Sequence, residues 1–238
     1  MRHTFLYPLH IVIPVMGSVV FLLYYRVSGW SEALQIAGYT EVIGIALPFG
    51  VSIVCAGNVG LEEKNHFQSF LGGSAYKWDS FLAKFLVLLS LGMMAVAAAV
   101  FFFAAGYQYI LGKEGISYGT YGRLAAIMCL GSVPLYLEHL FLNLMFTRQV
   151  SLCAGVTEFL ISSLFLTGLG NGRWPFFPCT WSARSAALLL VYANEKEGEG
   201  ILPVEMKSEA VVCLLLMLLI CVIIRVWFHF YEGRQCND

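Results

Sequence analysis

The sequence has few charged residues. Only 12% of its 238 residues are Asp, Glu, Lys or Arg, whereas 59% are hydrophobic. A soluble domain needs about a quarter charged residues to cover its surface. The composition therefore excludes a soluble, disordered or peripheral protein and predicts an integral membrane protein. Its 14 basic and 15 acidic residues nearly cancel, to a formal net charge of −1, so no binding of nucleic acid is expected.

Motifs for metal and nucleotide binding are also missing. The seven cysteines form no CxxC pair and no Cys/His spacing suited to zinc. Most of them lie in apolar runs, as small packing residues do. No GxxxxGK[ST] motif occurs, because the Gly-rich stretch 168–172 lacks the lysine and the hydroxyl that cradle a phosphate. We therefore expect a chain without metal or cofactor that does not itself hydrolyse ATP.

Six apolar runs approach the roughly 20 residues that a membrane-spanning helix needs. They cover about residues 9–25, 39–58, 81–109, 124–146, 150–169 and 210–230. Only residues 147–149 separate the fourth run from the fifth, which predicts an antiparallel hairpin. We expect one all-α membrane domain over residues 1–238, with six spans and both termini on the same side.

A long polar and aromatic segment, 171–209, separates the last two spans. Its apolar piece 186–192 is too short to span, so it is a possible re-entrant half-helix that enters from the outer side and is covered by protein. Four aromatic residues near its start are either outer contacts for an apolar substrate or plain interfacial anchors. They are Trp174, Phe176, Phe177 and Trp181.

The loop 60–84 after the second span is the most informative polar stretch. Its first half predicts an amphipathic helix that starts with charge and ends at Gly72-Gly73. Such a helix either transmits force from a soluble partner or only anchors the loop at the membrane surface.

The residues of this loop resemble those of the ABC-2 type permease family. The resemblance rests on the six-span layout, Glu62-Glu63, the stretch Phe67-Gln68-Ser69-Phe70-Leu71, Lys77 and Phe81-Leu82-Ala83-Lys84. The opening 9–14 with Tyr24-Tyr25, and the stretch 174–180, resemble the lantibiotic-immunity permeases, particularly the MutG group. In the family this loop is a cytoplasmic coupling helix, which implies an ATPase-coupling role for Glu62, Glu63, Phe67, Gln68, Phe70 and Leu71.

The resemblance also implies partners, localisation and function. ATP and Mg would be bound by a separate ABC ATPase, present in two copies, and a second permease chain, the same or different, would complete the translocation path. The complex would expel a lantibiotic-type cationic peptide from the bacterial cell membrane. Basic residues do not orient the chain, because seven would lie on each side; the family orientation places both termini in the cytoplasm.

Three ionisable residues lie inside expected spans, where each is costly. Glu138 and His139 belong to the fourth span and Glu158 to the fifth. Because these spans form a hairpin, Glu138 and Glu158 are expected at similar depth. They either line a substrate path or form a polar lock between helices.

Other function classes stay open. One is an exporter of the same type for another amphipathic substrate or a lipid. An ion-driven secondary transporter would be expected to show internal repeats, and none is evident between the two groups of three spans. An intramembrane enzyme lacks support, because His10, His139 and His229 form no HExxH motif and Ser162-Ser163 lacks a Gly-x-Ser-x-Gly context.

Overall fold

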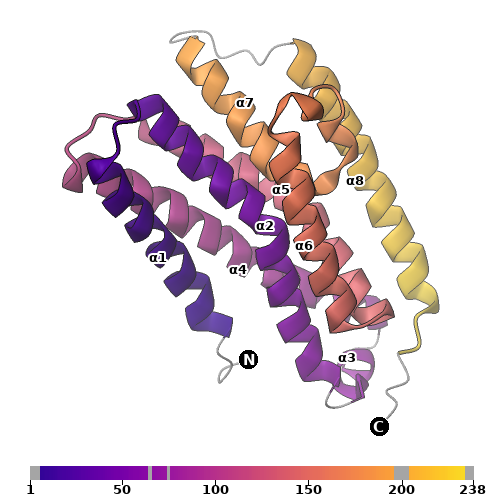
Figure 1. Cartoon of the computed structure of the whole chain (residues 1–238). Coiled ribbons are helices and arrows are strands. Elements are labelled where there is room, and N and C mark those ends of the chain that lie inside the picture. The colour runs from indigo at the N-terminus through magenta and orange to yellow at the C-terminus, as the bar shows by residue number, and fades with distance from the viewer. Residues whose placement is uncertain (1–5, 64–65, 74–75, 196–203, 234–238) are drawn as a thin grey trace.

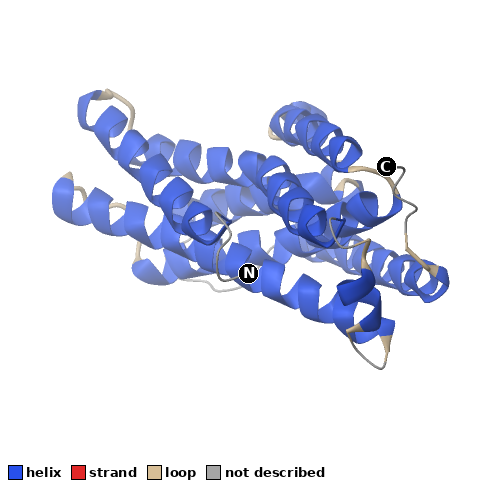
Figure 2. Ribbon diagram, turned by 90° about the horizontal axis from the view of Figure 1, so that it is seen from below, coloured by secondary structure: helices blue, strands red, loops and turns tan. Residues whose placement is uncertain are grey.

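The computed structural model describes residues 6–63, 66–73, 76–195 and 204–233, and these are helical with no strand among them (Figures 1 and 2). The α-helices are α1 (Leu6–Val27), α2 (Glu32–Glu63), α3 (Gln68–Gly72), α4 (Lys77–Ala105), α5 (Tyr118–Met145), α6 (Arg148–Phe165), α7 (Trp181–Glu195) and α8 (Val204–Phe230). A π-helix, η1 (Gly106–Ile110), extends α4, and three 3₁₀ turns, η2 (Gly168–Gly170), η3 (Trp174–Phe176) and η4 (Pro178–Thr180), lie between α6 and α7.

Five helices are long and apolar enough to cross a membrane. They are α1, α2, α4 with η1, α5 and α8. The expected all-α membrane architecture is thus confirmed at this level. The expected span 150–169 corresponds to α6, which has 18 residues, begins with Arg148 and Gln149 and carries Glu158. It is not among the five, so the count of six spans remains a prediction.

The helices form a bundle in which α2 is central. It packs against α5, α6 and α7, while α1 lies mainly against α4 and α8 lies beside α5 and η3. The start of α1, the end of α2, α3 and the end of α8 lie at one end of the bundle, the lower end in Figure 1. We call this the α3 end. The turns that follow α1 and η1 lie at the opposite end.

Two apolar clusters form the core, one toward each end. The cluster at the α3 end joins Val59, Phe81, Leu140 and Phe228 with other buried residues. The second is rich in aromatic residues, and within it the rings of Tyr39 and Phe103 stack with centroids 3.7 Å apart. Each cluster draws side chains from at least three helices, so it fixes their mutual positions.

The segment after α6 turns back into the bundle before α7 begins. η4 packs against α5 and α6, and its Cys179 belongs to the core cluster of the α3 end. The first turn of α7 then packs between α2 and α5. A Cβ added at Gly44 would lie 2.5 Å from the Ala183 Cα, and one at Gly131 would lie 2.7 Å from the Ser182 nitrogen. Only glycine permits this approach, so these two positions seat α7.

We expect Gly131→Ala to destabilise the fold by about 1–3 kcal/mol, because the added methyl group overpacks the contact with α7. Thermal unfolding in detergent measures the effect. Gly119→Ala is the control, since a Cβ there is exposed and meets only the Ser117 hydroxyl at 3.7 Å. Equal stability of the Gly131 variant and the wild type would contradict the close contact.

Candidate functional site

A buried lysine joins three helices at the α3 end. The Nζ of Lys84 lies 2.7 Å from Oδ1 of Asn58 and 2.9 Å from Oε1 of Glu62, and it stands 5.3 Å from the ring centroid of Phe70. Lys84 is 9% exposed. Asn58 and Glu62 are one helical turn apart on α2, so both face the same point on α4. The ammonium therefore ties α4 to the end of α2, and through Phe70 to α3.

The helix expected in this loop differs from the one observed. Glu62 and Glu63 were predicted to start it, but they are the last residues of α2, and α3 covers only Gln68–Gly72. α2 and α3 are separate helices because His66 and Phe67, which lie between them, have φ values of 48° and 59°. An α-helix cannot continue through residues in this conformation. Their backbone N–H groups donate to the carbonyls of Glu63 and Glu62 and so close α2. The predicted end at Gly72-Gly73 is confirmed.

The six predicted coupling residues fall into different environments. Phe67 and Phe70 are buried, and Phe70 packs edge-to-face on Phe228 of α8 with centroids 5.9 Å apart. Glu62 pairs with Lys84. Glu63 pairs with Arg148, whose Nε lies 3.5 Å from Oε2 of Glu63. Leu71 is half-buried, and Gln68 is exposed. Of the six, only Gln68 is exposed, whereas the other five are buried or partly buried.

The end of α8 is fixed to the same junction. Nζ of Lys77 donates to the Tyr231 carbonyl at 2.8 Å, and the Tyr231 hydroxyl donates to the Leu144 carbonyl at 3.2 Å. These bonds link the start of α4, the end of α5 and the residue that follows α8. Together with the contacts of Lys84, they connect the ends of α2, α4, α5 and α8 beside α3.

A second polar cluster lies between α5 and α6. Nε2 of His139 lies 3.1 Å from Oε2 of Glu158, and its Nδ1 lies 3.0 Å from the Ser151 hydroxyl. Asn143 donates to the same hydroxyl at 2.7 Å and to the His139 carbonyl at 2.6 Å. Glu138 interacts with Glu158 as well. Glu138 and Glu158 therefore meet across the hairpin as the sequence predicts, with His139 as the nearest partner of Glu158.

A neutral His139 satisfies both hydrogen bonds of its own ring. If Nε2 carries the hydrogen, it donates to the Glu158 carboxylate, and Nδ1 accepts from the Ser151 hydroxyl. Ser151 in turn accepts from Asn143. The His139 side chain has no exposed surface, and that of Glu158 is 10% exposed. Such a closed network has the features of a polar lock, because its groups face each other and not an open path.

The four aromatic residues predicted to lie on the outer side also separate into two pairs. Trp174 and Trp181 are buried, and their indole nitrogens donate to Oε1 of Glu209 and to the Pro175 carbonyl. Phe176 is 61% exposed, and Phe177, whose ring packs edge-to-face on Phe165, is 40% exposed. Of the four, only the two phenylalanines are exposed at the surface.

Neither a ligand-binding motif nor a relative identifies the site. Among the described residues, no group of three or more His, Cys, Asp or Glu side chains is placed to hold a metal ion. No protein-family model, curated protein or solved structure matches this chain. The function must therefore be argued from the geometry of the α3 end and of the polar cluster.

We expect a double-mutant cycle of Lys84→Met and Glu62→Gln to give a coupling energy of about 1–3 kcal/mol, because the ammonium is buried and directly bonded. The matched cycle of Arg148→Met and Glu63→Gln should give about 0.5 kcal/mol or less, since that pair is longer and half-exposed. Chemical unfolding in detergent measures both. Equal coupling in the two cycles would contradict a special role for Lys84.

We also expect Glu158→Gln to keep the fold within experimental error of wild type, since the amide oxygen can still accept from His139. Glu158→Leu should cost about 1–3 kcal/mol, because it leaves a buried N–H group without an acceptor. Thermal unfolding compares the two variants. A Gln variant as unstable as the Leu variant would show that the carboxylate charge, and not the hydrogen bond, stabilises the cluster.

Proposed function

We propose that the chain is the permease subunit of an ABC transporter, driven by a separate ATPase that docks on the α3 end. The observation that carries this proposal is the Lys84 junction. A short helix with an exposed polar side chain, Gln68, is joined by a buried ion pair and an aromatic cluster to helices that can cross the membrane. A surface helix fixed in this way suits the transmission of force.

The proposed mechanism follows from these attachments. ATP with Mg is bound and hydrolysed by the partner, which occurs in two copies. Its movement displaces α3 through the exposed groups of this end, Gln68 and Tyr76. Because Lys84 connects α3 with α2 and α4, the displacement of α3 is transmitted to both helices. The buried phenylalanines serve as the rigid attachment, so that the force is not lost in side-chain motion.

In the proposed topology the α3 end is cytoplasmic, and α6 is the fifth of six spans, in addition to the five helices named above. At 18 residues and 1.5 Å per residue α6 is roughly 27 Å long, close to the thickness of the hydrocarbon core. The segment from η2 through α7 is then a re-entrant element that enters from the outer side. Its contacts with α2, α5 and α6 support this placement, because a re-entrant backbone must be covered by protein.

We propose a cationic, amphipathic peptide of the lantibiotic type as the substrate, expelled from the bacterial cell membrane to give self-protection. Phe176 and Phe177 are the exposed aromatic residues of the re-entrant element and suit the apolar face of such a peptide. A second permease chain, identical or different, would complete the path. Another amphipathic molecule or a lipid is the alternative substrate for the same machine.

A second candidate function is ion-driven secondary transport. The buried His139–Glu158 pair favours it, because proton-coupled carriers place such groups within their spans. The two candidates differ in their partners. An ABC permease must bind an ATPase, whereas a secondary transporter needs none.

The test uses a sensitive bacterial strain that expresses this chain with its ATPase and second permease. We expect the strain to survive higher lantibiotic doses than one lacking this chain. Combining Gln68→Arg with Tyr76→Ala should lower both ATPase co-purification and the surviving dose, each by roughly tenfold, if these side chains are central to the interface.

Tyr109→Ala is the matched control, because Tyr109 is an equally exposed tyrosine, 77% against 73%, at the opposite end of the bundle. It should leave co-purification unchanged. Equal survival with and without this chain would refute peptide export. Reproducible absence of an ATPase from the purified chain would favour the secondary transporter.

A further inference from the structure

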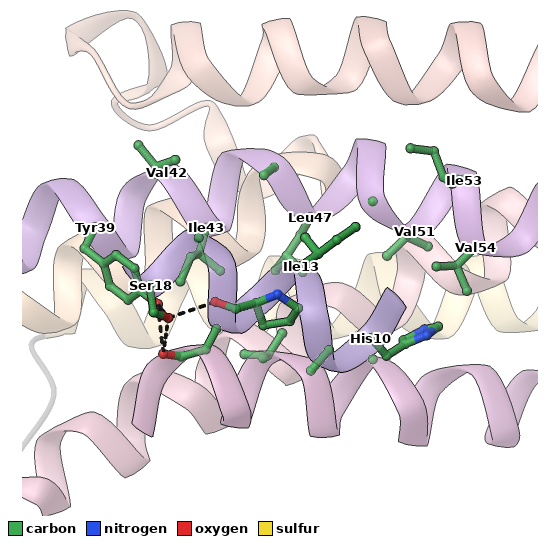
Figure 3. Close-up of a pocket in the computed structure, with 18 of the residues that line it drawn as sticks. His10, Ile13, Ser18, Tyr39, Val42, Ile43, Leu47, Val51, Ile53 and Val54 are labelled. Carbon is green, nitrogen blue, oxygen red and sulfur yellow. Dashed lines mark hydrogen bonds between the residues drawn. The ribbon is translucent and has the colours of Figure 1, made fainter. Parts of the chain in front are cut away.

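A cavity of about 300 Å³ lies between α1, α2 and α4 (Figure 3), and its lining contains none of the residues that pair with Lys84 or with His139. Its walls are almost entirely apolar. They include Phe21 of α1, Val42, Leu47 and Val51 of α2, and Val96 of α4. The volume is at the lower end of the range for small-molecule sites in proteins.

The hydroxyl groups at one end of the cavity are already paired. Ser18 and Tyr39 lie 2.6 Å apart, and the Pro14 and Ala99 carbonyls accept hydrogen bonds from Ser18 and Tyr39 respectively, each at 2.8 Å (Figure 3). A buried water needs two to four polar partners. His10 lies at the far end of the cavity, and Tyr136 adds a third hydroxyl to its lining. The rest of the wall is apolar, so most of the cavity is suited to an apolar occupant.

The cavity opens sideways on the face formed by α1 and α2. Six residues of its lining are exposed on the molecular surface: Ile13, Gly17, Val42, Ala46, Gly50 and Ile53. The helices that bound the cavity are three of the five able to cross a membrane. In a bilayer this rim faces hydrocarbon, so lipid chains are the molecules at its entrance.

Two glycines lie on the exposed rim of the cavity. Gly17 of α1 and Gly50 of α2 line it, and a Cβ added at either would meet nothing within 4 Å. Gly44 and Gly131 differ, because a Cβ there would collide with α7. A larger side chain at position 17 or 50 therefore has room to occupy the entrance of the cavity.

We propose that this cavity binds one acyl chain of a membrane lipid. An empty void would leave its lining without dispersion contacts on one side, whereas a methylene chain entering between Ile13 and Val42 supplies them without burying a polar group. The lipid acts as a wedge between α1 and α2, and α1 is held chiefly by α4. This proposal does not depend on an ATPase or on peptide export.

The test uses photo-crosslinking of the full chain in phosphatidylcholine–phosphatidylglycerol vesicles. The probe is phosphatidylcholine with a diazirine in one acyl chain, and mass spectrometry locates the adducts. We expect adducts at the buried lining residues Val51 and Val96 in the wild type. Gly17→Leu and Gly50→Leu, which fill the cavity from opposite walls, should each reduce them by roughly tenfold.

Two controls make the result specific. Gly119→Leu adds the same side chain to an exposed helical glycine outside the cavity and should leave the adducts unchanged. Labelling of the exposed Leu218 on α8 serves as the reference in every sample. Circular dichroism and size-exclusion chromatography select the folded variants, and either of the two cavity variants suffices.

Two outcomes would overturn the proposal. One is labelling of Leu218 but not of the lining residues in the wild type. The other is lining adducts of equal intensity in wild type and folded cavity variants, which would place the lipid elsewhere.

Discussion

The ammonium group of Lys84 lies where three helices meet, and its surroundings leave it little access to water. A charge in such a place is tolerated only if other groups replace the water that it has lost. Asn58 and Glu62 do so from one turn of α2, and the Phe70 ring adds its face. To bring Glu62 to this point, α2 must stay helical as far as the loop. The requirement to pair one buried charge thereby sets the length of α2 and the position of α3.

Hydropathy and spacing predict the long helices well, because lipid and protein interior both select apolar side chains over some 20 residues. The five helices that can cross a membrane each contain one of the predicted runs. The same reasoning fails at the ends of the helices. The pattern of 61–71 resembles an amphipathic helix, but Phe67 and Phe70 face the core of this chain and not a membrane surface. Their partner Phe228 is far away in sequence, so no local pattern could reveal it.

For the buried polar residues and the aromatic residues, too, the sequence predicts only part of the arrangement. The hairpin places Glu138 near Glu158 by residue counting alone, but it does not reveal that His139 and Ser151 complete the network. Among the outer aromatic residues, composition could not separate the buried Trp174 and Trp181 from the exposed Phe176 and Phe177. Both tryptophans form hydrogen bonds because the backbone after α6 turns back into the bundle and places their indole rings beside an acceptor. That path depends on the close approach of α7 to Gly44 and Gly131.

The glycines show how the two ends of the molecule can be coupled. Gly44 and Gly131 allow α7 to pack closely between α2 and α5, whereas Gly17 and Gly50 line the space between α1 and α2. In the proposed transporter, a displacement of α3 tilts α4 through Lys84, and α1 follows because it packs on α4. The separation of α1 from α2, and with it the room for an acyl chain, then depends on the position of α3. Since such coupling is reciprocal, a lipid chain in the cavity would favour the helix arrangement with the wider gap and would bias the position that α3 presents to the ATPase.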